Sequence, residues 1–177
     1  MKRIVSSLAA AIAMVSVAAA QSPVRKPAVE GITNFAQVES TVACAGALKP
    51  GSVAAIAKMG FASIVNLRLA SEPGANVDAE EAAAKAAGIR FVHLPFDGAA
   101  PDAAVVDRFL KTIVEPGCQP AFIHCSGGNR AAMMWFIKRV LIDKWDNDRA
   151  MDEAAQLGLI SPALKTFALD YIRAHKK

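Results

Sequence analysis

The chain has 177 residues, of which 54% are hydrophobic and 20% are charged, and its formal net charge is +4. This length suits one domain with a sizeable core, and the composition excludes a disordered acidic tail, a collagen-like chain and a low-complexity chain. Three cysteines are too few for the disulfide framework of a small secreted domain.

The first twenty residues have the features of a secretory signal. Lys2 and Arg3 form a basic start, residues 4–17 are apolar, and small residues precede an expected cleavage site between Ala20 and Gln21. The alternative is an uncleaved anchor, for which this run is short. Cleavage would leave 157 residues with a net charge of +2, which removes the support for a nucleic-acid-binding surface. We therefore expect an exported protein, periplasmic or secreted, without a stable membrane anchor.

The remaining chain alternates between strand and helix patterns. Strands are expected where short apolar runs end near glycine or proline, at residues 41–45, 62–67, 89–94 and 121–124. Helices are expected where apolar residues recur at helical spacing between capping residues, at residues 50–58, 78–87, 101–114, 129–142, 148–157 and 162–175.

This alternation predicts an α/β fold with a mainly parallel sheet of four to five strands and helices on both faces. The expected organisation is a signal peptide at 1–20, a flexible lead-in at 21–34 and one catalytic domain at 35–177. Ligands of such sheets bind at the carboxyl ends of the strands. The chemistry-bearing residues should therefore follow a strand directly.

Cys125 follows the strand expected at 121–124, in a glycine-rich turn that opens into a helix. Glycines let backbone N–H groups turn inward, and the helix start adds the positive end of its dipole. Arg130 adds a planar, permanently charged fork that suits a tetrahedral oxyanion. Groups that hold an anion also stabilise a thiolate, so we expect Cys125 to be a nucleophile at neutral pH. The residues expected to bind the anion are Ser126, Gly127, Gly128, Asn129 and Arg130.

The segment resembles the phosphate-binding loop of cysteine-dependent tyrosine and dual-specificity phosphatases. His124, Cys125 and Gly128 match the pattern His-Cys-x-x-Gly-x-x-Arg, whereas Arg130 comes one residue early. The shorter Cys-x4-Arg spacing resembles the bacterial phosphatase-like family related to beta-lactamase hydrolase-like proteins. The flanking sequences resemble the same family at residues 46–50, 65–68 and 91–95.

The resemblance implies phosphomonoester hydrolysis through a phosphocysteine, on a phosphorylated small molecule or a phosphorylated protein. It implies Cys125 as nucleophile, Arg130 as oxyanion holder and His124 as a residue that orients the loop. Two departures bear on activity: the loop is short, and Ala131 stands where the main family has a hydroxyl residue that helps expel the thiolate. The resemblance implies no cofactor, and no cluster has zinc-like spacing, so no metal is expected.

A phosphatase also needs a general acid for the leaving oxygen. Asp97 follows the strand expected at 89–94 and is the first candidate, although an aspartate beside glycine is also ordinary turn chemistry. Asp102 is the second candidate, and its alternative role is to interact with the dipole at a helix start. Glu72 is expected to pair with Arg68.

Two further questions stay open in the sequence. Cys44 could pair with Cys118, or Cys118 could pair with Cys125 as a redox partner. Sulfur transfer of the rhodanese type is an alternative function, because those enzymes also place a cysteine in a short strand-to-helix loop. A non-catalytic module that binds anions or phosphoproteins is the third possibility, motivated by Ala131.

Overall fold

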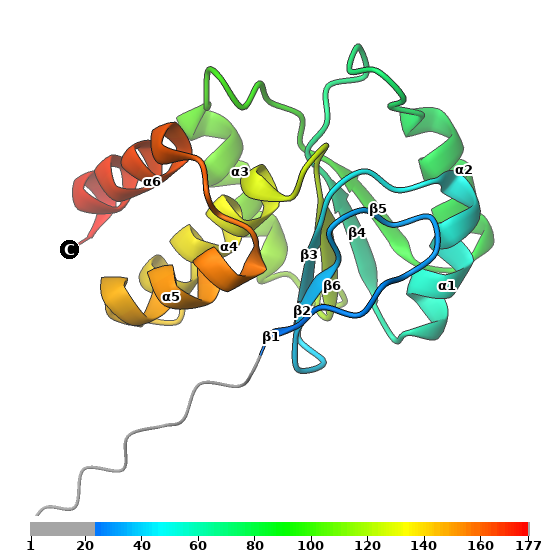
Figure 1. The fold of residues 1–177 in the computed structure, drawn as a ribbon, viewed down its shortest axis with the longest axis horizontal. Helices are drawn as coiled ribbons and strands as arrows, with labels where there is room; N and C mark the ends of the chain where they lie inside the picture. Colours follow the sequence, from blue (N-terminus) through cyan, green and yellow to red (C-terminus); the bar gives the residue numbers. More distant parts are fainter. Residues whose placement is uncertain (1–23, 177) are drawn as a thin grey trace, which may run out of the picture.

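The computed structural model describes residues 24–176, so the expected signal peptide lies outside the described residues. Its centre is a mainly parallel sheet with helices on both faces, which confirms the expected α/β fold (Figure 1). The strands in chain order are β1 (Val24–Arg25), β2 (Ala36–Val38), β3 (Val42–Ala45), β4 (Ser63–Asn66), β5 (Arg90–His93) and β6 (Ala121–His124).

The order of strands across the sheet is β1-β2-β3-β6-β4-β5. The four strands β3, β6, β4 and β5 are parallel, and β1 and β2 extend the sheet as antiparallel neighbours. The sheet thus has six strands instead of the four to five expected. The two strands that the sequence pattern missed have only two and three residues, too few for an alternation of apolar and polar residues to stand out.

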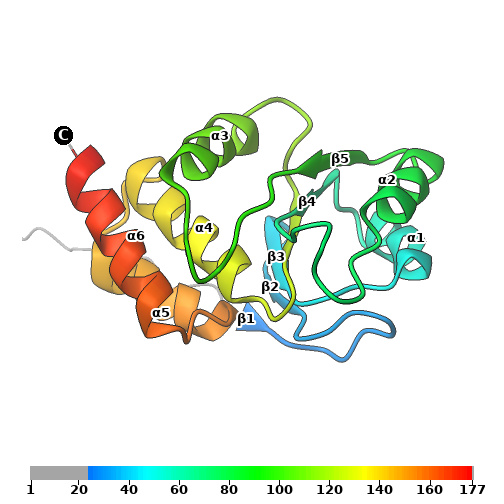
Figure 2. The same cartoon turned by 90° about the horizontal axis from the view of Figure 1, so that it is seen from above.

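The helices divide between the two faces of the sheet (Figure 2). On one face lie α1 and α2, and on the other face lie α3 to α6, as both ribbon views show. All six were expected, and their bounds are α1 (Val53–Lys58, after a 3₁₀ turn at Pro50–Ser52), α2 (Val77–Ala86), α3 (Ala103–Ile113), α4 (Asn129–Leu141), α5 (Asn147–Leu157) and α6 (Pro162–His175).

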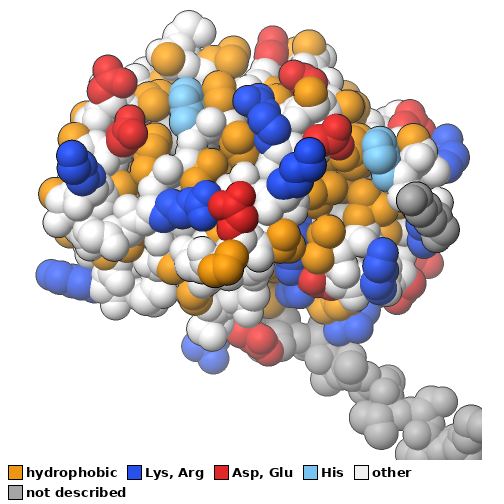
Figure 3. Space-filling model, turned by 180° about the vertical axis from the view of Figure 1, so that it is seen from behind, with side chains coloured by type: hydrophobic (Ala, Val, Ile, Leu, Met, Phe, Trp, Pro, Cys, Tyr) orange, Lys and Arg blue, Asp and Glu red, His pale blue; other side chains and the backbone are white. Residues whose placement is uncertain are grey.

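The surface of the described part carries charges of both signs. On the face seen in Figure 3, Lys and Arg side chains alternate with Asp and Glu side chains rather than gather in one basic patch. Among residues 24–176, no helix combines the length and the apolar character that a membrane crossing requires.

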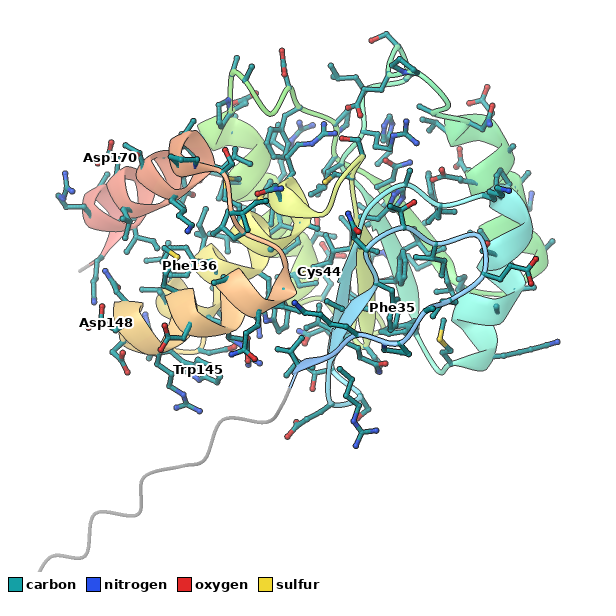
Figure 4. All side chains as sticks on the ribbon, in the orientation of Figure 1. Phe35, Cys44, Phe136, Trp145, Asp148 and Asp170 are labelled. Atoms are coloured by element: carbon teal, nitrogen blue, oxygen red, sulfur yellow. The ribbon has the colours of Figure 1, made fainter. Side chains whose placement is uncertain are left out.

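Alternating side chains of the sheet form two hydrophobic layers. Phe122 of β6 points to the α1 and α2 side, where it stacks on Phe35 with ring centroids 6.2 Å apart. Ile123 points to the opposite side and packs in the layer that contains Phe136 of α4. The two sides are visible in Figure 4, where Phe35 and Phe136 are labelled.

Helix α4 is central to the larger layer, as its nearly continuous apolar sequence predicts. Trp135 is fully buried, and its indole N–H donates to Glu153 of α5 at 2.8 Å. Burial of each large side chain contributes about 1.5–3 kcal/mol to folding. The start of α4 is therefore held firmly against the carboxyl end of β6.

Candidate active site

Cys125 sits immediately after the central strand of the parallel sheet. Its N–H donates to the carbonyl of Ala45 at the end of β3, at 3.2 Å. On the other side of β6, the N–H of Leu67 donates to the carbonyl of His124 at 2.9 Å. Both neighbouring strands thus fix the backbone just before the loop, and the Cys125 side chain is 1% exposed.

Residues 125–130, which we call the cysteine loop, curl around the sulfur. Gly128 has a φ of 100° and begins α4, and its N–H donates to Cys125 Sγ at 3.0 Å. The carbonyl of Ser126 accepts a hydrogen bond from the Ala47 N–H at 2.9 Å. A Cβ on neighbouring Gly46 would lie 2.9 Å from that same carbonyl, so close approach of the two loops requires a glycine there.

Arg130 is oriented by five hydrogen bonds. Its Nη1 donates to Glu72 Oε1 at 2.7 Å, to the Leu67 carbonyl at 2.9 Å and to the Phe96 carbonyl at 2.6 Å. Its Nη2 donates to Glu72 Oε2 at 2.8 Å and to Ser126 Oγ at 3.2 Å. This fork is locked in one direction at the edge of the cavity that contains Cys125.

The two charges stabilise each other. Burial alone would raise the pKa of Glu72, but hydrogen bonds from Arg130 and from the Leu69 N–H outweigh it and lower that pKa. Burial alone would lower the pKa of Arg130. Its hydrogen bonds to Glu72 and the charge on Cys125 outweigh burial, so the pKa of Arg130 is raised above its ordinary value. The ion pair between Glu72 and Arg68 that the sequence predicts is present, at 3.4 Å. The closer partner of Glu72 is Arg130, at 2.7 Å, which no sequence pattern indicated.

Asp97 borders the same cavity, which has a volume of about 420 Å³. The backbone on either side of Asp97 touches the arginine: the Phe96 carbonyl accepts from Arg130, and a Cβ on Gly98 would lie 3.6 Å from the Arg130 side chain. The Asp97 carboxylate accepts from the Ala99 N–H at 2.9 Å and is otherwise exposed. This position suits a proton donor to a group that leaves the cavity.

Asp102, the second candidate for the acid, has a different place. It is the N-cap of α3, and its carboxylate accepts from the Ala104 N–H at 2.8 Å. It is not among the residues that line the cavity. Of the two candidates, Asp97 borders the cavity that contains Cys125, whereas Asp102 caps a helix.

His124 lies beneath the loop rather than in the cavity. Its Nε2 is 3.2 Å from Oε2 of Glu80, and the same carboxylate oxygen accepts from Asn66 Nδ2 at 2.7 Å. All three side chains are fully buried. The placement fits the expected orienting role of His124, and sequence analysis missed Glu80 because it lies on a helix remote from the loop in sequence.

Asn129 has a role that the sequence did not reveal. Its Oδ1 accepts from the N–H groups of Ile160 and Ser161, each at 2.8 Å. The side chain therefore anchors the connection between α5 and α6 to the cysteine loop, while Asn129 still borders the cavity.

Neither expected cysteine pairing is present among residues 24–176, because all three cysteines are free thiols. Cys118 precedes β6 and contacts Ser63 of β4, whereas Cys125 follows β6, so the length of that strand separates them. Cys44 is buried in β3, opposite Ile123, and burial, followed by the charge on Cys125, holds its pKa well above the ordinary value. In the described residues, no three His, Cys, Asp or Glu side chains are grouped as a metal site requires.

Comparison with known proteins points to one family. The phosphatase-like domain of the beta-lactamase hydrolase-like protein matches residues 34–142. The beta-lactamase hydrolase-like protein of Xylella fastidiosa is 33% identical over 106 residues. That alignment spans 58% of this chain but only 23% of the relative, so the chain corresponds to a minor part of that longer protein.

Solved structures agree with this family at the level of the fold. A DUF442 protein from Shewanella putrefaciens superposes with a TM-score of 0.69 at 17% identity, covering 84% of this chain and 94% of that one. TpbA of Pseudomonas aeruginosa has a TM-score of 0.63 at 22% identity, with 88% and 92% covered. The catalytic domain of the yeast phosphatase SIW14 has a TM-score of 0.64 at 19% identity, with 80% and 87% covered.

Proposed function

Because this chain belongs to the family of the phosphatase-like domain of beta-lactamase hydrolase-like proteins, we propose that it hydrolyses phosphomonoesters through a phosphocysteine. The observation that carries the proposal is the hydrogen bond from the Gly128 N–H to Cys125 Sγ, beside the fixed fork of Arg130. Nucleophile and anion-binding donors converge on one point, as covalent phosphoryl transfer requires.

The reaction follows from this arrangement in two steps. The Cys125 thiolate attacks phosphorus, an S–P bond forms, and the P–O ester bond breaks while Asp97 gives its proton to the leaving oxygen. The loop amides and Arg130 hold the other phosphate oxygens. Water then attacks phosphorus and loses a proton to the Asp97 carboxylate, the S–P bond breaks, and inorganic phosphate leaves. Ala131 offers no hydroxyl to the departing thiolate, so this second step is expected to be the slower one.

The fold relatives support a phosphorylated substrate. TpbA has been crystallised, as a variant, in complex with phosphotyrosine, and SIW14 is described as a PP-IP phosphatase. The cavity that Cys125 borders has a volume of about 420 Å³. We include phosphotyrosine among the proposed substrates.

A turnover assay with an aryl phosphate under reducing conditions tests the function. The wild-type protein should release phosphate, and Cys125→Ser should release none. Cys118→Ala is the matched control, since Cys118 is also a buried thiol but lies at the opposite end of β6. No release by the wild-type protein, or release by the Cys125→Ser protein, contradicts the proposal.

Sulfur transfer is a second candidate, favoured by the charge balance of the loop. Glu72 binds both terminal nitrogens of Arg130, which offsets the positive charge that a phosphate dianion would use. A persulfide on Cys125 carries less charge and needs less room in a short loop. Thiocyanate formation from thiosulfate and cyanide would favour this reaction, and silence in both assays with retained phosphate binding would favour an anion-binding module.

We further propose that the protein is exported. The support is the sequence pattern of residues 1–20, with its basic start, apolar run and small residues before the cleavage site. Expression with the native amino terminus, followed by periplasmic extraction and amino-terminal sequencing, should yield a chain that begins at Gln21. Recovery of the uncleaved chain from the cytoplasm would contradict export.

A further inference from the structure

A second cavity adjoins the catalytic one. It has a volume of about 540 Å³ and shares Gly127 and Asn129 with the catalytic cavity. Its walls carry apolar side chains, among them Val29, Ile32, Phe35, Leu157 and Ile160, together with the polar side chains of Lys26, Asn34 and Gln156. We call it the flanking cavity. Its size and its lining are those of pockets that bind small organic groups.

Both walls of the flanking cavity are tied to the cysteine loop. On one wall, the Asn34 side-chain amide donates to the carbonyl of Gly127 at 3.1 Å. On the other wall, Asn129 accepts from the N–H of Ile160. Ser161, held by the same Asn129 oxygen, lines the catalytic cavity. The relative positions of the two cavities are therefore set by the loop that carries the nucleophile.

Ile160 is unusual among the large apolar residues of the described chain. It is 71% exposed, more than Met59, Val114 or Ile142, which are the other exposed members of that group. Its backbone is nevertheless held by Asn129 at 2.8 Å. An apolar ligand that covers this exposed isoleucine at the rim of the cavity would remove apolar surface from water, which favours binding.

The passage between the cavities is open. Gly127 is exposed, and no heavy atom lies within 4 Å of the position that its Cβ would occupy. In an in-line displacement the leaving oxygen lies opposite Cys125 Sγ, so the organic group of the ester points out of the catalytic cavity. From there it can extend over Gly127, which borders both cavities, toward the flanking cavity.

We propose that the flanking cavity binds the organic part of the substrate, and that the preferred substrates are monoesters whose alcohol or phenol carries an extended apolar group. This inference rests on the proposed function, since the phosphate must occupy the cysteine loop.

Binding measurements with Cys125→Ser protein test the inference without requiring turnover. Calorimetry should give 4-biphenylyl phosphate an affinity about tenfold higher than that of phenyl phosphate, because its second ring is buried. Adding Ile160→Ala should shrink that ratio to about threefold by removing one wall contact. Ile142→Ala is the matched control, an exposed isoleucine after α4 that should leave the ratio unchanged.

The possible outcomes separate the two proposals. Equal affinity for the two esters, or a ratio that Ile160→Ala does not alter, overturns the flanking cavity as a substrate site. If neither ester binds, the phosphatase proposal fails, and the inference fails with it. If ultracentrifugation shows a dimer that Ile160→Asp dissociates, the apolar rim belongs to a contact between two copies, and the inference is overturned.

Discussion

At Arg130, hydrogen bonds to the protein fix the guanidinium without any need for a ligand. Two of the five go to the Glu72 carboxylate, and two go to the backbone carbonyls of Leu67 and Phe96. A side chain of this length normally loses much rotational freedom when it binds an anion. Here that entropy is lost during folding instead, so the fork can act as a fixed part of the site.

Glu72→Gln tests this fixed orientation. We expect the free energy of unfolding at pH 7 to fall by about 1–2 kcal/mol, because one charge-assisted pair is lost. Phosphatase activity should fall roughly 10- to 100-fold as the fork loses its alignment. Because the folded state lowers the pKa of Glu72, its contribution exists above the ordinary value of 4.5 and disappears as the pH falls through the lowered pKa.

The measurement is urea unfolding of both proteins at pH 7 and at a series of lower pH values, along which the difference between the two stabilities should shrink. Glu115→Gln is the matched control, because Glu115 pairs with Arg90 at an exposed site. Its effect should stay below about 0.5 kcal/mol. A stability difference for Glu72→Gln that does not change with pH would contradict the assigned role of the ion pair.

Asp97→Asn tests the general acid. The variant should slow hydrolysis of an alkyl phosphate about 100-fold. It should slow p-nitrophenyl phosphate far less, because that leaving group needs little protonation. Asp102→Asn is the control: asparagine also caps helices well, so the ratio of the two rates should not change. Equal slowing of both substrates by Asp97→Asn would assign the proton transfer to another group.

Among the elements, the junction of β6 and α4 depends on a left-handed residue. Gly128, with its φ of 100°, both begins the helix and donates to Cys125 Sγ. Gly158 is also left-handed, with a φ of 115°, but it ends α5 and has no heavy atom within 4 Å of its Cβ position. Both glycines have a left-handed backbone conformation, but only Gly128 contacts Cys125.

Substitution of each glycine by alanine distinguishes the effect of backbone strain on stability from the effect of the Gly128 N–H on activity. Both variants should lose about 1–2 kcal/mol of stability, because alanine is strained in the left-handed region. Gly128→Ala should also lose most phosphatase activity, since the N–H that points at the sulfur would turn away. Thermal unfolding and turnover would be measured for both, and equal activity in the two variants would contradict a special role for the Gly128 N–H.

Local signals explain which elements could be predicted. Ser161 caps α6 and Pro162 occupies its first turn, and the structure has that helix at the expected bounds. By contrast, β1 and β2 are defined by pairing with strands elsewhere in the chain. The cysteine loop was recognisable because its residues are contiguous. The Glu72 contact with Arg130 spans 58 positions and depends on the path of two loops, which no local pattern encodes.

At the scale of the whole molecule, a buried polar group joins three elements. Asn66 of β4, Glu80 of α2 and His124 of β6 meet in the layer on the α1 and α2 side of the sheet. A buried carboxylate is costly unless it is paired, and the hydrogen bond from Asn66 to Glu80 Oε2 requires that helix α2 stay docked on the sheet, while Glu80 Oε1 has no hydrogen-bond partner among the described residues. The group thus connects a helix remote from the cavity to the strand that carries the nucleophile.

Glu80→Leu should lower the free energy of unfolding by about 1–3 kcal/mol, because the buried Asn66 amide loses its acceptor. Glu80→Gln should cost less, since its amide oxygen can still accept from Asn66. Glu81→Gln is the control, an exposed neighbour on the same helix whose effect should be within about 0.5 kcal/mol. Urea unfolding of the three variants is the measurement. Equal stabilities would contradict a stabilising role for the buried group formed by Asn66, Glu80 and His124.

The anchor at Asn129 has an evolutionary consequence. The family match ends at residue 142, yet Ile160, Ser161 and Leu164, which come after it, line the two cavities. The Asn129 amide oxygen is one of several groups that attach this later segment, and Glu153 of α5, which accepts from Trp135, is another. Substitutions at these three cavity-lining positions could therefore change which molecules are bound while Cys125 and Arg130 stay in place.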